Sequence, residues 1–137
     1  MIVTKSILQQ YFLKWRSQYF GFSLPIPKFV LTKKFKNVAR FECMVNTYNK
    51  STSDETIYFS TEYDYTEKQL DELMCHEMIH YKLCYDGTDP KCSHGMHFMN
   101  MAKDINRKFS LNIGEFVHGL NKKENYSKFH YFLSFLE

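Results

Sequence analysis

His76-Glu77-Met78-Ile79-His80 is the stretch around which this chain is organised, because it sets two histidines four residues apart with a glutamate after the first. Residues four apart on an α-helix lie on one face, since the helix turns by about 100° per residue. Two such imidazoles can bind one Zn²⁺, and Glu77 lies beside them, where its carboxylate can hold a metal-bound water. Zinc lowers the pKa of that water to roughly 7, so the pattern predicts hydrolysis of a carbonyl group with Glu77 as general base.

The residues around the motif predict that it lies on a helix. Residues 67–74 lead into it without glycine or proline, and their apolar side chains recur at helical spacing. Thr66 is a suitable N-cap, and Gln69 completes the pattern of a capping box. We expect the helix to run to about Tyr85, because the glycine and proline of residues 86–90 then end it. The alternative is that two histidines on an ordinary helix spell the motif by chance.

A catalytic zinc needs a third protein ligand and keeps its fourth position for water. His94 and His97 are the candidates, at the entrance of a further predicted helix. If Phe98 of that helix faces the core, His97 turns away from the core by about 100°. Gly95 lets the backbone beside His94 approach its surroundings closely. The sequence therefore favours His94 over His97, with Cys92 as a weaker third choice.

The composition is that of a folded domain. The chain has 137 residues, 44% of them hydrophobic and 18% aromatic, which is enough for one domain over residues 1–137. Its four cysteines form no C-x-x-C pair, which favours reduced thiols; a Cys84–Cys92 bridge is the alternative. No apolar run has the length of a membrane span and the N-terminus lacks a signal-peptide pattern, so we expect a cytoplasmic chain without membrane contact.

The remaining elements predict a small sheet flanked by helices. A broad aromatic stripe predicts a first helix over residues 4–20. Short apolar segments at residues 29–32, 38–45 and 56–60 predict a three-stranded antiparallel meander. Together with the motif helix, these elements predict an α+β, zincin-like domain with its core over about residues 4–118, in which the sheet packs against the motif helix and the flanking helices.

Charge and the C-terminal residues leave several roles open. The net charge of +3 and pI near 8.6 permit contact with nucleic acid without arguing for it. The lysines of residues 33–37 form either a solvated loop or an edge that contacts phosphate, the candidate surface for DNA. His97 and His118 are the candidates for an auxiliary group of the site, against the alternative that each is packed or exposed. Residues 125–137 predict a helical tail that covers the core or, alternatively, binds a partner or gates substrate.

Two motifs together resemble a known family. His76-Glu77-Met78-Ile79-His80, followed by His94-Gly95-Met96-His97-Phe98, is similar to the pattern of the SprT-like zinc metallopeptidases, which include the Spartan proteases. That pattern is H-E-x-x-H, a short loop, then H-G-x-x-[FW]. The resemblance covers roughly residues 4–118, and the first helix, the strands and the motif helix follow the family's order. It implies that His76, His80 and His94 hold one zinc ion and that Glu77 is the general base. Gly95 and Phe98 would be structural positions of the second motif.

The resemblance also implies a zinc metalloendopeptidase, and several members of the family act on proteins attached to DNA. DNA-repair members commonly carry a zinc-binding segment after the protease core, whereas no cysteine follows Cys92 in this sequence. This departure puts DNA dependence in doubt but not the protease chemistry. Two other functions stay open: a catalytically silent nucleic-acid or protein binding module with structural zinc, and a zinc hydrolase of non-peptide amides. The glutamate argues against the first, because a structural site has no use for a base beside an open coordination position.

Overall fold

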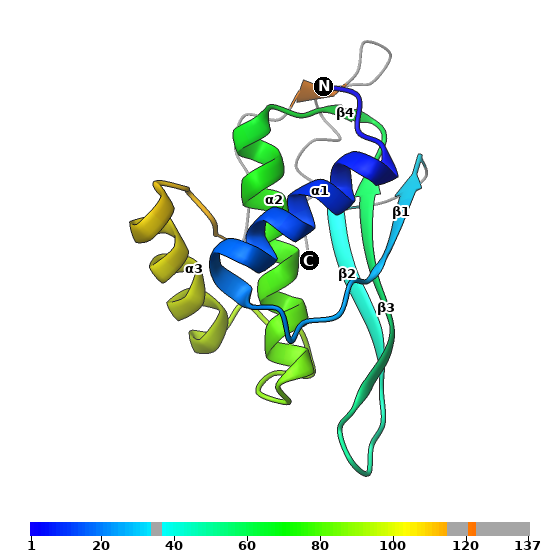
Figure 1. Cartoon of the computed structure of the whole chain (residues 1–137), viewed down its shortest axis with the longest axis vertical. Helices are drawn as coiled ribbons and strands as arrows, with labels where there is room; N and C mark the ends of the chain where they lie inside the picture. Colours follow the sequence, from blue (N-terminus) through cyan, green and yellow to red (C-terminus); the bar gives the residue numbers. More distant parts are fainter. Residues whose placement is uncertain (34–36, 115–120, 123–137) are drawn as a thin grey trace.

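The computed structural model describes residues 1–33, 37–114 and 121–122, and it shows an α+β domain in which a small sheet lies beside three helices (Figure 1). The strongly twisted β2–β3 hairpin extends beyond the helices. The predicted tail helix over residues 125–137 and the predicted auxiliary residue His118 lie outside the described residues. The α+β fold class is confirmed, and a cluster of three histidines beside the sheet is consistent with a zincin-like fold.

The sheet is mixed, with strand order β1–β3–β2. β2 (Ala39–Val45) and β3 (Thr52–Ser60) form the predicted antiparallel hairpin, although β3 begins four residues earlier than the pattern indicated. β1 (Lys28–Thr32) pairs with β3 and runs parallel to it. The prediction of a wholly antiparallel meander was therefore wrong at this edge of the sheet.

The connection between β1 and β2 explains the difference. The two strands run in opposite directions, as a short connection requires, but β3 lies between them. They are two strand spacings apart, about 10 Å. The six residues that connect them can cover about 20 Å when extended, which is enough to span this distance. The backbone N–H groups at the end of β3 bond to both neighbours, since Ser60 donates to the Val38 carbonyl and Thr61 donates to the Thr32 carbonyl. The end of β3 is thus held between the two strands.

One face of the sheet builds the core. Alternate residues of β2 and β3 point toward the helices, and Phe41, Ile57 and Phe59 are buried there. The ring of Phe41 stacks on Tyr81 of the motif helix, with 4.9 Å between ring centroids. This contact fixes the sheet against the helix that carries the motif.

The first helix packs across the motif helix. α1 (Lys5–Trp15) begins at the N-cap Thr4 and continues as the π-helical segment η1 (Arg16–Phe20), so the predicted helix over residues 4–20 has the expected bounds but a wider last turn. The indole Nε1 of Trp15 donates to the Asp71 carboxylate at 2.9 Å. That bond joins α1 to the helix below it, since a buried indole N–H needs an acceptor.

α2 (Glu67–Tyr85) is the motif helix and has the predicted bounds. Thr66 Oγ1 accepts from the Gln69 backbone and Gln69 Oε1 accepts from the Thr66 backbone, which is the predicted capping box. α2 contacts α1, α3 and the sheet, and nearly all of its residues from Gln69 onward are buried. A helix covered on so many sides has little room for polar groups, so its buried polar residues identify the site.

α3 (Met96–Phe109) packs on α2, away from the sheet (Figure 1). The side chains of Phe98, Ala102 and Ile105 are fully buried, so Phe98 faces the core. Two short strands, β4 (Tyr63–Asp64) and β5 (Asn121–Lys122), pair outside the main sheet. In the part of the chain that the structure describes, no helix combines the length and apolar character needed to cross a membrane.

Candidate metal centre

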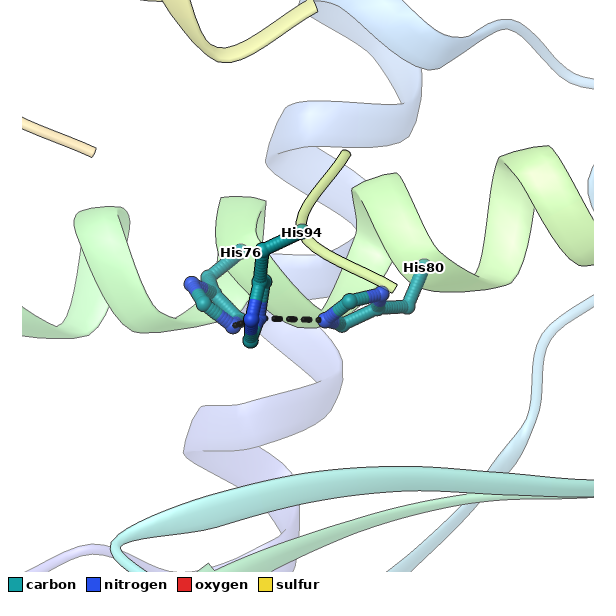
Figure 2. A group of neighbouring side chains, drawn as sticks. All are labelled: His76, His80 and His94. Atoms are coloured by element: carbon teal, nitrogen blue, oxygen red, sulfur yellow. Dashed lines mark hydrogen bonds between the residues drawn. The ribbon is translucent and has the colours of Figure 1, made fainter. Parts of the chain in front are cut away.

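Three histidines from two parts of the chain point toward one another (Figure 2). His76 and His80 project from consecutive turns of α2, and His94 comes from the loop before α3. The His94 Nε2 atom lies 3.1 Å from Nε2 of His76 and 3.1 Å from Nε2 of His80. Zn–N bonds of 2.0–2.1 Å in a tetrahedral site separate the ligand nitrogens by about 3.3 Å. The two distances from His94 therefore agree with the spacing of tetrahedral ligands, and all three ligand atoms lie within 4.8 Å of one another.

The donors and acceptors of this cluster fit a metal ion. His76 Nδ1 lies 2.9 Å from the Gly114 carbonyl, which can only accept, so Nδ1 carries the proton of the neutral ring and Nε2 presents a lone pair. A proton on His94 Nε2 can serve one of its two close neighbours but not both. A cation bound by the three Nε2 lone pairs satisfies all of these contacts at once.

Burial keeps the α2 histidines in the form that binds metals. It lowers the pKa of His76 well below its usual range, and the neighbouring His80 and His94 lower it further. Burial, with a contribution from His94, lowers the pKa of His80 to about 4. Both imidazoles are therefore neutral near pH 7, and only a neutral imidazole has a lone pair for a metal.

The ring of Phe98 packs against all three histidine rings. Its ring centroid lies 4.8 Å from the centroid of each of the His76, His80 and His94 rings. The Phe98 side chain is completely buried. An apolar ring in this position limits the rotation of the imidazoles and excludes water from one side of the cluster.

Glu77 lies beside the cluster, as the motif predicted. Glu77 is only 4% exposed, and its Oε2 atom lies 3.9 Å from His76 Nε2. A carboxylate at this distance can reach a water bound at the position that the three histidines leave free. The geometry therefore agrees with a general base, while that role itself stays a prediction.

The loop before α3 delivers His94. The Asp89 carboxylate accepts from the backbone N–H groups of Lys91 and Ser93 and from the Ser93 hydroxyl, which folds the loop back on itself. A side chain added at Gly95 would begin 3.3 Å from the Ser93 hydroxyl oxygen, so the backbone there is close to its surroundings, as predicted. These local bonds set the direction in which His94 enters the site.

The other predicted candidates lie apart from this trio. His97 is exposed on the first turn of α3, and Cys92 is half-buried in the preceding loop. Neither belongs to the group of histidines whose ligand atoms lie within 4.8 Å of one another. All four cysteines are free thiols, so the alternative Cys84–Cys92 bridge is not formed. The ligand role of His94 over His97 stays a prediction that this placement favours.

Sequence reasoning missed the Gly114 carbonyl and the residues that hold it. Glu72 accepts from the Asn112 backbone, and Asn106 bonds to the Ile113 backbone. One signal was available for Glu72, because it lies four residues before His76 and therefore on the same face of the helix. A backbone carbonyl carries no such signal, since every residue has one.

The sequence of this chain is similar to that of a known protein family. A family model described as the SprT-like family matches residues 8–119. The matched part contains β1, β2, β3, α2 and α3 as well as the three clustered histidines. The comparison with curated proteins finds no match.

Proposed function

Since the chain belongs to the SprT-like family, we propose that it is a zinc-dependent metalloendopeptidase. The observation that carries the proposal is the convergence of His76, His80 and His94 within 4.8 Å, with the buried carboxylate of Glu77 beside them. Three histidines with a fourth position free are typical of a catalytic zinc site, whereas structural sites are closed by four protein ligands.

The chemistry divides between the ion and Glu77. His76, His80 and His94 would hold the zinc, which when bound supplies a Lewis acid that activates water and polarises the scissile carbonyl. Glu77 takes a proton from the attacking water as the oxygen–carbon bond forms. It then gives that proton to the leaving nitrogen as the carbon–nitrogen bond breaks. The burial of Glu77 shields this transfer from bulk water.

The sheet offers a surface for an extended protein substrate. β2 is an edge strand of the three-stranded sheet, and a groove of about 510 Å³ runs along β2 and β3. Pro90 and Cys92, which belong to the loop that carries His94, also line this groove. An edge strand can pair with an extended peptide through its free backbone groups. These features support a protein substrate, and DNA-associated proteins are the class that the family resemblance suggests.

Contact with DNA is a separate part of the proposal. The candidate surface is the lysine-rich loop over residues 33–37, of which residues 34–36 lie outside the described part of the chain. The cleavage assay is therefore carried out both with and without single-stranded DNA.

The decisive experiment compares the wild type with Glu77→Gln, after each is loaded with zinc and incubated with an unfolded protein substrate. Glu77→Gln should keep one zinc per chain by elemental analysis and should release no peptides by mass spectrometry. His94→Ala should lose the zinc, and His97→Ala, the matched control three residues away, should keep both zinc and cleavage. Single-stranded DNA added to the wild type tests whether cleavage depends on DNA.

Two results would contradict the proposal. Cleavage by Glu77→Gln at the wild-type rate would remove the general base from the mechanism. A wild type that binds zinc but cleaves nothing, with or without DNA, would favour the alternative of a silent nucleic-acid or protein binding module.

A further inference from the structure

A two-point hydrogen bond joins α3 to the chain that follows it. Asn106 Nδ2 donates to the Ile113 carbonyl at 2.9 Å, and Asn106 Oδ1 accepts from the Ile113 backbone N–H at 2.7 Å. One amide side chain thus satisfies both backbone groups of one residue. The Ile113 side chain is itself buried, 5% exposed. A segment held at two polar atoms and one apolar side chain has little freedom to rotate.

A carboxylate on α2 holds the neighbouring residue. Glu72 Oε2 accepts from the Asn112 backbone N–H at 2.6 Å, and Glu72 is only 7% exposed. A hydrogen bond to a carboxylate is roughly twice as strong as one between neutral groups. The segment is therefore attached to both α2 and α3.

The held segment ends at the metal cluster. Gly114 directly follows Ile113, and its carbonyl lies 2.9 Å from His76 Nδ1. Glu72 lies one helical turn before His76 on α2. The chain of contacts therefore starts on the helix that carries His76, passes through the backbone of residues 112–114, and returns to the far nitrogen of the same histidine.

We propose that Asn106 and Glu72 are positioning residues that clamp the backbone of residues 112–114, so that the Gly114 carbonyl fixes the tautomer and ring orientation of His76. The bond to Gly114 keeps the proton on His76 Nδ1 and directs the Nε2 lone pair into the cluster. The inference rests on the proposed function only in taking a metal ion as the occupant of that cluster. The clamp itself consists of contacts within the described residues.

The first test is zinc affinity, measured by competition with a chromophoric chelator. Asn106→Ala and Glu72→Ala should each weaken zinc binding by about 10- to 100-fold, which is the usual loss when a partner behind a metal-bound histidine is removed. Glu72→Gln keeps an oxygen that can accept from Asn112 and should restore most of the affinity. Asn100→Ala is the matched control, because Asn100 is an exposed asparagine on the same helix.

The second test follows the His76 tautomer by nitrogen-15 NMR of the metal-free protein. This measurement does not depend on zinc binding or on activity. The wild type should show a protonated Nδ1 at His76, and Asn106→Ala should show a mixture of tautomers while its amide spectrum stays that of a folded chain. If Asn106→Ala does not fold, Asn106→Asp replaces it in this test. The aspartate keeps Oδ1 but replaces the donor by a second acceptor, so it should show the same mixture of tautomers.

The outcomes separate the two proposals. Unchanged zinc affinity together with an unchanged His76 tautomer in both alanine variants would overturn the clamp. A wild type that binds no zinc would instead overturn the proposed function, and the tautomer measurement would still decide the clamp.

Discussion

Phe98→Ala removes the ring on which the three histidines rest, and its effect can be worked out from the structure. Phe98 is 0% exposed, and its ring centroid lies 4.8 Å from that of each histidine. Replacing a fully buried phenylalanine by alanine costs about 3–5 kcal/mol, from the lost burial of the ring and the cavity left behind. Domains of this size unfold with about 5–15 kcal/mol, so the variant should lose a large share of its stability.

A second effect separates support of the metal centre from ordinary packing. A ligand that binds only the folded chain adds about 2.7 kcal/mol at a concentration 100 times its dissociation constant. A tenfold loss of affinity removes about 1.4 kcal/mol of that increment. Because Phe98 orders the rings that bind the ion, the gain in unfolding free energy on adding zinc should shrink by at least this amount in Phe98→Ala.

The assay is urea unfolding in zinc and in chelator, followed by the fluorescence of Trp15, which is 2% exposed against Phe109. Phe59→Ala is the matched control, because Phe59 is equally buried but contacts Tyr65 on the sheet side of the core. It should lose a similar 3–5 kcal/mol and keep the full zinc increment. A loss below about 1 kcal/mol in Phe98→Ala, or a zinc increment equal to that of Phe59→Ala, would refute the reasoning.

Two further predictions concern α2 and the sheet. Tyr81→Phe removes the hydroxyl that donates to the Pro25 carbonyl at 2.7 Å and should lower the free energy of unfolding by about 1 kcal/mol; an unchanged urea midpoint would contradict this. Burial, assisted by the hydrogen bond to Cys84, raises the pKa of the Cys43 thiol to about 12. Since a raised pKa leaves almost no thiolate at pH 8, Cys43 should react with iodoacetamide far more slowly than a model thiol, and rapid labelling in native peptide mapping would show the opposite.

The motif helix was predictable because its signals are local. The four-residue spacing of His76 and His80 and the capping box at Thr66 and Gln69 each depend on residues within one turn. These features determined the N-terminal end of α2 and the face that carries the site, and the glycine and proline of residues 86–90 determined its C-terminal end. His94 could be favoured for a similar reason, since Phe98 indicated which way the next helix faces.

The pairing of the strands depends on information that no local pattern holds. The segments that form β2 and β3 could be located in the sequence, because the period of two in a strand is a property of each strand alone. Whether β1 joins the sheet beside β2 or beside β3 depends on contacts between distant segments of the chain. In the structure Phe29 lies against Phe12 of α1, with 5.8 Å between ring centroids. That contact is available only when both chain segments are folded, so the sequence pattern left it undetermined.

The buried polar residues of α2 show why the site and the helix cannot be considered separately. Glu72, His76, Glu77 and His80 are 7%, 8%, 4% and 6% exposed, on a helix that would be more stable with apolar groups there. Burying a polar group is costly unless it is partnered, and a protein keeps such groups chiefly where function needs them. Glu72 and His76 meet the same backbone segment, and His76 and His80 meet His94. The chain that follows α2 therefore partners these groups, which is why residues as distant as His94 and Gly114 converge on a single face of one helix.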